Sequence, residues 1–132
     1  MSSFRQRLRQ FIRLVDETSR RADPLNFHAQ SRAIQLLKRH LTPEQRAQYE
    51  KHCYFYVSGG NSGRIYRIRH GAQLNVEQLD KRGKRIGVLC FMPEGGLAVG
   101  DIMLAQKVAL ELFETEALQI ANTMPTLETF LG

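Results

Sequence analysis

Four short runs of strand-forming residues follow one another between residues 53 and 92, and turn-forming residues separate each run from the next. The runs cover residues 54–57, 64–69, 73–79 and 85–92. They are rich in aromatic and β-branched residues, which fit a pleated surface. The connections are short and contain glycine, asparagine, serine or aspartate, which favour tight turns. The stretch therefore predicts an antiparallel meander of three to four strands. The last run is nearly continuous and apolar, so it is expected to be the most buried strand, covered on both faces.

Helical patterns precede this segment. Residues 4–20 carry apolar side chains at helical spacing. Asp23 and Pro24 have the residue types of a helix start, and that helix is expected to run to about residue 40. Thr42 and Gln45 have capping-box spacing and begin a third helix that ends near residue 52.

A helical pattern also follows the strands. Asp101 is expected to cap a helix that runs to about Phe113 and packs across the sheet. Its expected apolar stripe includes Leu112, and a break near Glu114 and Thr115 separates it from a second segment at residues 116–121. The chain is therefore predicted to be one α+β domain, residues 1–132. Its parts are a helical region (1–52), the meander (53–92), a C-terminal helical region (98–122) and a tail (123–132).

Strand alternation suggests a mixed aromatic and cationic surface on the sheet. In the first run Tyr54 and Tyr56 share one face, and in the second run Arg67 and Arg69 share one face. If these two faces coincide, the surface could stack bases and neutralise phosphates. The alternative is an ordinary one-sided sheet, with half-buried tyrosines and solvated arginines.

The charge is positive and unevenly distributed. The net charge is +6 and the sequence pI is about 9.7. Residues 1–48 carry ten Lys or Arg against four acids, whereas residues 102–132 carry one against four. Arg5, Arg9 and Arg13 recur at helical spacing, and like charges at that spacing repel one another. Nucleic acid, an acidic protein surface or a membrane would relieve this repulsion, although a solvated helix face is the alternative.

Two turns have residue types that suit an anion site. Lys81, Arg82, Lys84 and Arg85 place four positive charges on one short hairpin, which makes it the best small anion-binding element in the sequence. The glycine-rich loop at residues 59–63 is interpreted as a plain hairpin turn. A phosphate-binding loop precedes a helix, whereas a strand follows this one.

No catalytic or metal-binding constellation stands out. The four histidines are scattered without Ser-His-Asp or Cys-His arrangements, and His52, Cys53, His70 and Cys90 lack zinc-ligand spacing. We therefore expect no enzyme activity, no metal and no cofactor. Cys53 and Cys90 are expected to be free, buried thiols in a reducing compartment, which favours the cytoplasm. No apolar run approaches the roughly 20 residues that span a bilayer.

The sequence thus leads to two functional hypotheses. The first is a small, non-enzymatic module that binds DNA or RNA through the basic first helix, the tyrosine and arginine face and the basic hairpin. The second is an adaptor subunit of a larger homo- or hetero-oligomeric assembly, with a basic face for an acidic partner. Its docking residues would come from the first helix and the tail: Phe4, Leu8, Phe11, Leu127, Phe130 and Leu131.

Overall fold

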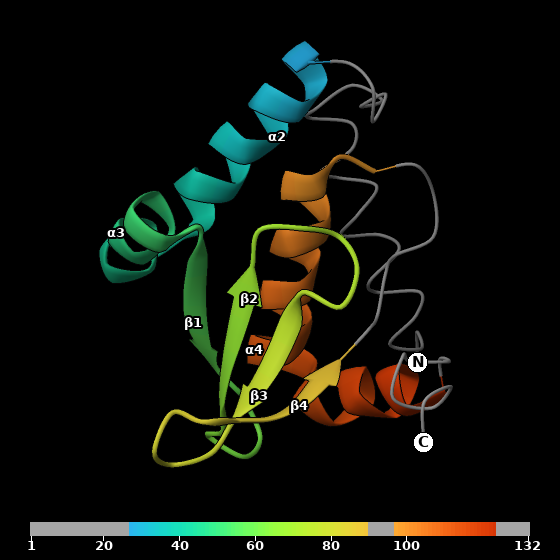
Figure 1. Cartoon of the computed structure of the whole chain (residues 1–132). Coiled ribbons are helices and arrows are strands. Elements are labelled where there is room, and N and C mark those ends of the chain that lie inside the picture. Colours follow the sequence, from blue (N-terminus) through green and yellow to red (C-terminus); the bar gives the residue numbers. More distant parts are fainter. Residues whose placement is uncertain (1–26, 90–96, 124–132) are drawn as a thin grey trace.

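The computed structural model describes residues 27–89 and 97–123 (Figure 1). Within these residues, two helices precede four strands, and one long helix follows them. The elements are α2 (Phe27–His40), α3 (Pro43–His52), β1 (Tyr54–Ser58), β2 (Ile65–Arg69), β3 (Val76–Leu79), β4 (Arg85–Leu89) and α4 (Val99–Thr123). The strands form one antiparallel sheet in the order β1-β2-β3-β4. The predicted α+β fold with a central meander and a packed C-terminal helix is confirmed.

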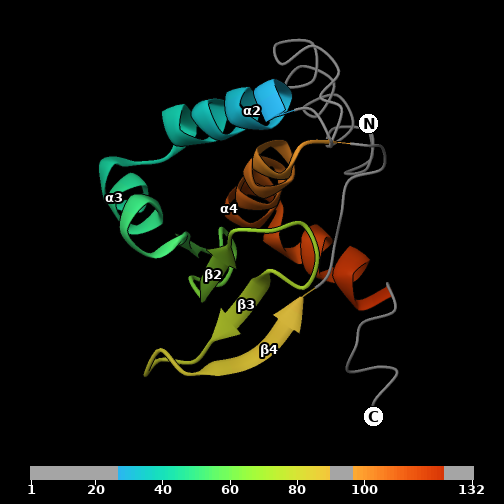
Figure 2. The same ribbon diagram turned by 45° about the horizontal axis from the view of Figure 1, so that its top comes forward.

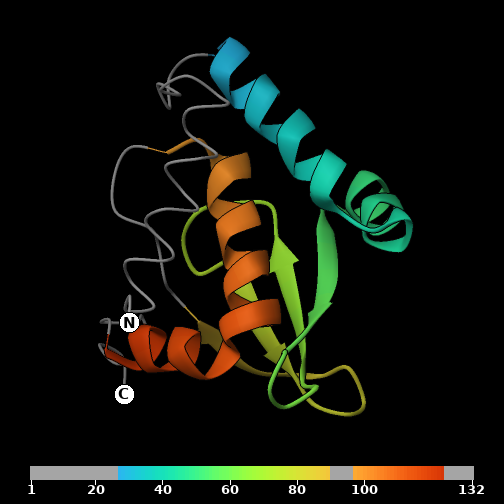
Figure 3. The same ribbon diagram turned by 180° about the vertical axis from the view of Figure 1, so that it is seen from behind.

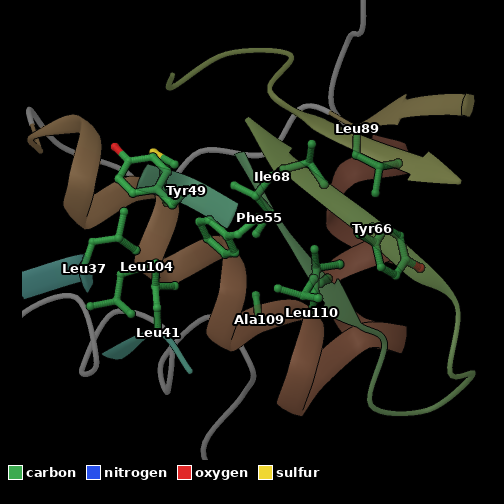
Figure 4. Packing of buried hydrophobic residues seen from close by; sticks show 14 of the residues in the cluster. Leu37, Leu41, Tyr49, Phe55, Tyr66, Ile68, Leu89, Leu104, Ala109 and Leu110 are labelled. Carbon is green, nitrogen blue, oxygen red and sulfur yellow. The ribbon is translucent and has the colours of Figure 1, made fainter. Parts of the chain in front are cut away.

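Helix α4 lies against one face of the sheet, and α2 lies beside the first part of α4 (Figures 2 and 3). Phe55, Ile68 and Leu89 extend from the sheet toward Leu104 and Leu110 of α4 in the main hydrophobic core (Figure 4). Burying such side chains contributes roughly 1.5–3 kcal/mol each. Helix α3 lies beside β1, and no described helix lies over the opposite face of the sheet (Figure 1). We call that opposite face the outer face.

Helix α3 begins as its capping pattern predicts. The Gln45 backbone N–H donates to the Thr42 hydroxyl at 3.1 Å, and the Thr42 N–H donates to the Gln45 side-chain oxygen at 3.1 Å. This reciprocal pair satisfies two backbone donors that the first helical turn leaves unpaired. The helix ends at Cys53 in a left-handed conformation, with φ of 60°. These two ends fix where the chain enters β1.

The strand predictions require two corrections. Strand β3 starts at Val76 rather than residue 73, because Leu74 has a positive φ of 52° and interrupts the extended backbone. Strand β4 is not the most buried strand over the part that the structure describes. It lies at one end of the strand order, and Ile86 is 60% exposed. An apolar run does not distinguish an edge position from a central one, so the sequence pattern was misleading here.

Helix α4 also differs from the prediction in detail. It begins at Val99, so Asp101 lies inside the first turn and is 2% exposed rather than capping the helix. Leu112 is 68% exposed and not part of the buried stripe. The predicted break is confirmed, since Phe113 has non-helical angles (φ −139°, ψ 41°).

The glycine loop between β1 and β2 docks on this break. The Gly60 N–H donates to the Leu110 carbonyl at 3.0 Å. The Asn61 side-chain oxygen accepts from the Thr115 N–H at 3.1 Å, and so acts as a cap for the second segment of α4. A side chain at position 60 would collide with the Glu111 backbone, so only glycine allows this approach. The loop therefore supplies hydrogen-bonding groups where the helix ladder is interrupted.

Candidate functional site

The sheet register brings the predicted tyrosines and arginines to the outer face. Tyr54 pairs with Arg69, and Tyr56 pairs with Arg67. Directly paired residues of an antiparallel sheet project to the same face. Phe55 and Tyr66, on the opposite face, are fully buried in the core. The two faces whose coincidence the sequence left open therefore do coincide, and Tyr54 and Tyr56 are half-buried on that face, as the alternative of a one-sided sheet expected.

A buried carboxylate lies at the centre of this surface. The Arg67 Nε atom donates to Glu77 Oε1 at 2.7 Å, and Glu77 is itself only 3% exposed in its side chain. Arg69 and Arg85 lie at 3.8 and 3.5 Å from the same carboxylate. Their side chains are 58% and 59% exposed, so their guanidinium groups remain largely in solvent. Three cations thus surround one anion.

The electrostatics of the cluster favour the ionised form of Glu77. Burial alone would raise the pKa of Glu77, but the Arg67 hydrogen bond and the charges of Arg67, Arg69 and Arg85 hold that pKa below its usual range. The hydrogen bond to Glu77 likewise raises the pKa of Arg67. Glu77 therefore stays ionised and compensates only one of the three positive charges.

An aromatic array borders the arginines. The Tyr54 ring stacks on His52 with centroids 5.2 Å apart, and it meets the Tyr56 ring edge-on at 5.5 Å. The Arg67 guanidinium carbon lies 5.1 Å from the Tyr54 ring centroid, within range of a cation–π interaction. His52 is exposed. Tyr54 thus lies between two ring partners, and His52 and Tyr56 form the two ends of the array.

The basic hairpin has a defined tip. Asp80 Oδ1 accepts from the Arg82 and Lys84 backbone N–H groups, both at 2.8 Å. Gly83 has a positive φ of 82° and completes the turn. Lys81, Arg82 and Lys84 are exposed, and none of them forms an ion pair with another described residue. Arg85 is different, because it joins the Glu77 cluster. The four predicted cations are therefore divided between the hairpin tip and the outer face.

The glycine loop holds an anion, but one from its own chain. The Asn61 and Ser62 N–H groups donate to Glu114 Oε1 at 3.0 and 2.7 Å. The Ser62 and Tyr66 hydroxyls donate to Glu114 Oε2, each at 2.6 Å. Burial would raise the pKa of Glu114, but these hydrogen bonds lower it below its usual range. The loop has no free amides to offer a phosphate at this position, which agrees with its interpretation as a hairpin turn.

The sequence missed two residues of the outer face. Glu77 lies in a strand whose register depends on the preceding loop, so its position opposite Arg67 was not predictable from its own neighbours. His52 was noted only as a poor metal ligand, although its place just before an aromatic strand was a usable signal for stacking. Cys53 was expected to be buried, but it is exposed and free.

Several predicted residues lie outside the described part of the chain. These are Arg5, Arg9 and Arg13 of the proposed nucleic-acid surface and the six docking residues, Phe4, Leu8, Phe11, Leu127, Phe130 and Leu131. Cys90 also lies outside it. Over residues 27–89 and 97–123, no group of three or more His, Cys, Asp or Glu side chains is arranged to hold a metal ion. The helices in these ranges include none with the length and apolar character to cross a bilayer.

Comparison of the chain with protein-family models, with curated proteins and with solved structures gives no match.

Proposed function

We propose that this protein binds single-stranded nucleic acid on the outer face of its sheet. The observation that carries the proposal is the excess of three arginines over one carboxylate beside the exposed His52 ring and the half-buried rings of Tyr54 and Tyr56. Arg69 and Arg85 contact backbone phosphates, while His52 and Tyr56 stack on bases. Unpaired bases expose the ring faces that such stacking needs, whereas a duplex covers them.

The basic hairpin extends the surface. The loop between β3 and β4 projects beyond the sheet (Figure 1), and it carries the exposed residues Lys81, Arg82 and Lys84. Long basic side chains on a projecting turn attract a polyanion without reading its sequence. In this proposal the hairpin strengthens binding, and the outer face determines where the strand lies.

Binding by the proposed surface should depend on salt and on Arg69 and Arg85 together. We expect the wild-type protein to bind a labelled single strand of about 12 nucleotides. The R69A/R85A double variant should bind roughly tenfold or more weakly at low salt, because it loses two phosphate contacts. Its affinity should also depend less on salt, since each lost contact reduces the magnitude of the log–log slope by about 0.7 for single strands. Fluorescence anisotropy over a series from about 50 to about 300 mM salt measures both quantities.

The matched control is R32A/R39A, which removes two exposed arginines from α2 and gives the same net charge. This variant should retain most of the affinity and the slope. Absence of binding by the wild-type protein even at the lowest salt would contradict the proposal. An equal loss of affinity in both double variants would also contradict it, because binding would then depend on total charge rather than on this face.

A further inference from the structure

A pocket of about 400 Å³ lies beside the outer face, between α3 and the β1 edge of the sheet. This volume is within the range of small-molecule sites in proteins. Its walls come from α3, from β1 and the start of β2, and from α4. The lining residues are Thr42, Glu44, Gln45, Gln48, Tyr56, Val57, Ser58, Ile65 and Glu111. Tyr56 lines the pocket and also belongs to the outer face, so the pocket and the outer face adjoin at this residue.

Two glutamines of α3 hold the helix beside β1. Gln48 accepts a hydrogen bond from the Tyr56 N–H at 3.0 Å, and Gln45 donates to the Tyr56 carbonyl at 2.9 Å. The edge strand is thus satisfied at Tyr56 by side-chain amides rather than by another strand, which also protects it from edge-to-edge pairing.

The pocket retains hydrogen-bonding groups that the fold does not use. The Gln48 side-chain N–H₂ has no acceptor among the described residues, because only its oxygen bonds Tyr56. The exposed Glu44 carboxylate has no described partner. By contrast, Glu111 is already engaged by Lys107 at 2.6 Å and by Gln45 at 3.2 Å. Glu44 and Gln48 are four residues apart on α3, so their side chains lie on the same side of the helix.

The charge of the pocket differs from that of the outer face. Glu44 and Glu111 make its lining acidic, and no lysine or arginine is among the lining residues, although Lys107 pairs with Glu111 and Arg67 interacts with Tyr56. A phosphate is therefore disfavoured in the pocket but favoured beside Arg69 and Arg85. Ile65, which is 38% exposed, supplies an apolar wall suited to the flat side of a ring.

From this arrangement we infer that the pocket receives one base of the bound strand and prefers guanine. This inference rests on the proposed function. Guanine presents two adjacent donors, N1–H and N2–H₂, that match a carboxylate such as Glu44, and its O6 acceptor matches the N–H₂ group of Gln48. Uracil and cytosine lack the pair of adjacent donors, and adenine has no imino proton. The strand would place its phosphates on the arginines and one base over the β1 edge.

The preference can be measured with four labelled oligouridines that differ only at one central position, which carries G, A, C or U. Anisotropy should show the G-containing strand bound roughly 5- to 100-fold more tightly by the wild-type protein, the range expected for one good bidentate contact. In E44Q this preference should fall to about twofold or less, while affinity for the all-U strand should stay the same or increase slightly. E50Q is the matched control, because it removes one exposed carboxylate from the same helix, at a residue outside the pocket lining.

The outcomes separate the two proposals. Salt-dependent binding of all four strands with equal affinity would overturn the pocket inference alone. A guanine preference that survives in E44Q would overturn the assigned contact. Failure of every strand to bind at low salt would overturn the proposed function and, with it, the role of the pocket.

Discussion

Replacing Glu114 with alanine should destabilise the protein by about 3–5 kcal/mol, because the change removes a buried charged acceptor from four hydrogen bonds, one of them from the buried Tyr66 hydroxyl. Glu114 is 1% exposed. Its carboxylate accepts hydrogen bonds from the Asn61 N–H, the Ser62 N–H and hydroxyl, and the Tyr66 hydroxyl. Small domains are stable by only about 5–15 kcal/mol, so the loss would be a large fraction of the total.

The physical basis is that one side chain joins three parts of the fold. Glu114 follows the break in α4 at Phe113, and it holds the glycine loop against that break. Without the carboxylate, the Tyr66 hydroxyl points into an emptied space beneath the sheet. The loop amides would have to find water instead. Both changes disfavour the folded state.

Urea titration followed by circular dichroism measures the effect as a shift of the midpoint at constant slope. E116A is the matched control, since it removes a less buried acid from the same helical segment. Y66F removes one of the four hydrogen bonds and should cost about 1–2 kcal/mol. The account would be wrong if E114A destabilised the protein no more than E116A.

Replacing Glu77 with glutamine should lower stability and raise affinity for polyanions at the same time. The change removes the only negative charge of the arginine cluster but keeps an acceptor for Arg67. Removal of one partner from a fully buried ion pair costs about 3–5 kcal/mol. Arg69 and Arg85 are more than half exposed, so solvent screening reduces the expected loss to about 2 kcal/mol.

The pH dependence follows from the lowered pKa of Glu77. A carboxyl group whose pKa is lower in the folded state stabilises that state above its unfolded pKa, near the ordinary value of 4.5. This contribution is lost as the pH falls from that value through the folded pKa. Glu114 has a lowered pKa as well and adds to the same acid-side loss. In E77Q the dependence of stability on pH below the ordinary value should therefore be weaker than in the wild type.

Denaturation at a series of pH values measures the stability of E77Q, and anisotropy with a labelled single strand measures its affinity for a polyanion. E50Q makes the same charge change at a residue that is 52% exposed and pairs with Lys38 and Arg46 on another surface. It should change stability by less than about 1 kcal/mol and leave binding nearly unaltered. Equal binding by E77Q and wild type would show that the arginine cluster does not meet the anion.

Features determined by neighbouring residues could be predicted from the sequence. Thr42 and Gln45 lie three positions apart, so their capping box is local. The alternation of Tyr54 and Tyr56 is local too, whereas the coincidence of their face with that of Arg67 and Arg69 depends on the register with β2, which the sequence left open. The break in α4 was expected near Glu114 and Thr115, and the structure has it at the adjacent Phe113.

Features determined by distant residues could not be predicted. Glu114 and Ser62 are 52 positions apart, and nothing in either segment indicates their contact. The position of Glu77 opposite Arg67 depends on the irregular loop at Leu74, whose left-handed backbone shortens β3. The exposure of Ile86 depends on the order of the strands, which a run of apolar residues does not specify.

The most direct test of the proposed surface is to locate a bound strand by ultraviolet crosslinking and mass spectrometry of the full-length protein. Trypsin cleaves after Lys51 and Arg64, and so releases His52, Tyr54 and Tyr56 on one peptide, residues 52–64. If the strand stacks on the outer face, crosslinked nucleotides should be found on this peptide, and R69A/R85A should reduce their yield. Efficient crosslinking to α2 or other segments with none on residues 52–64 would contradict binding on the outer face.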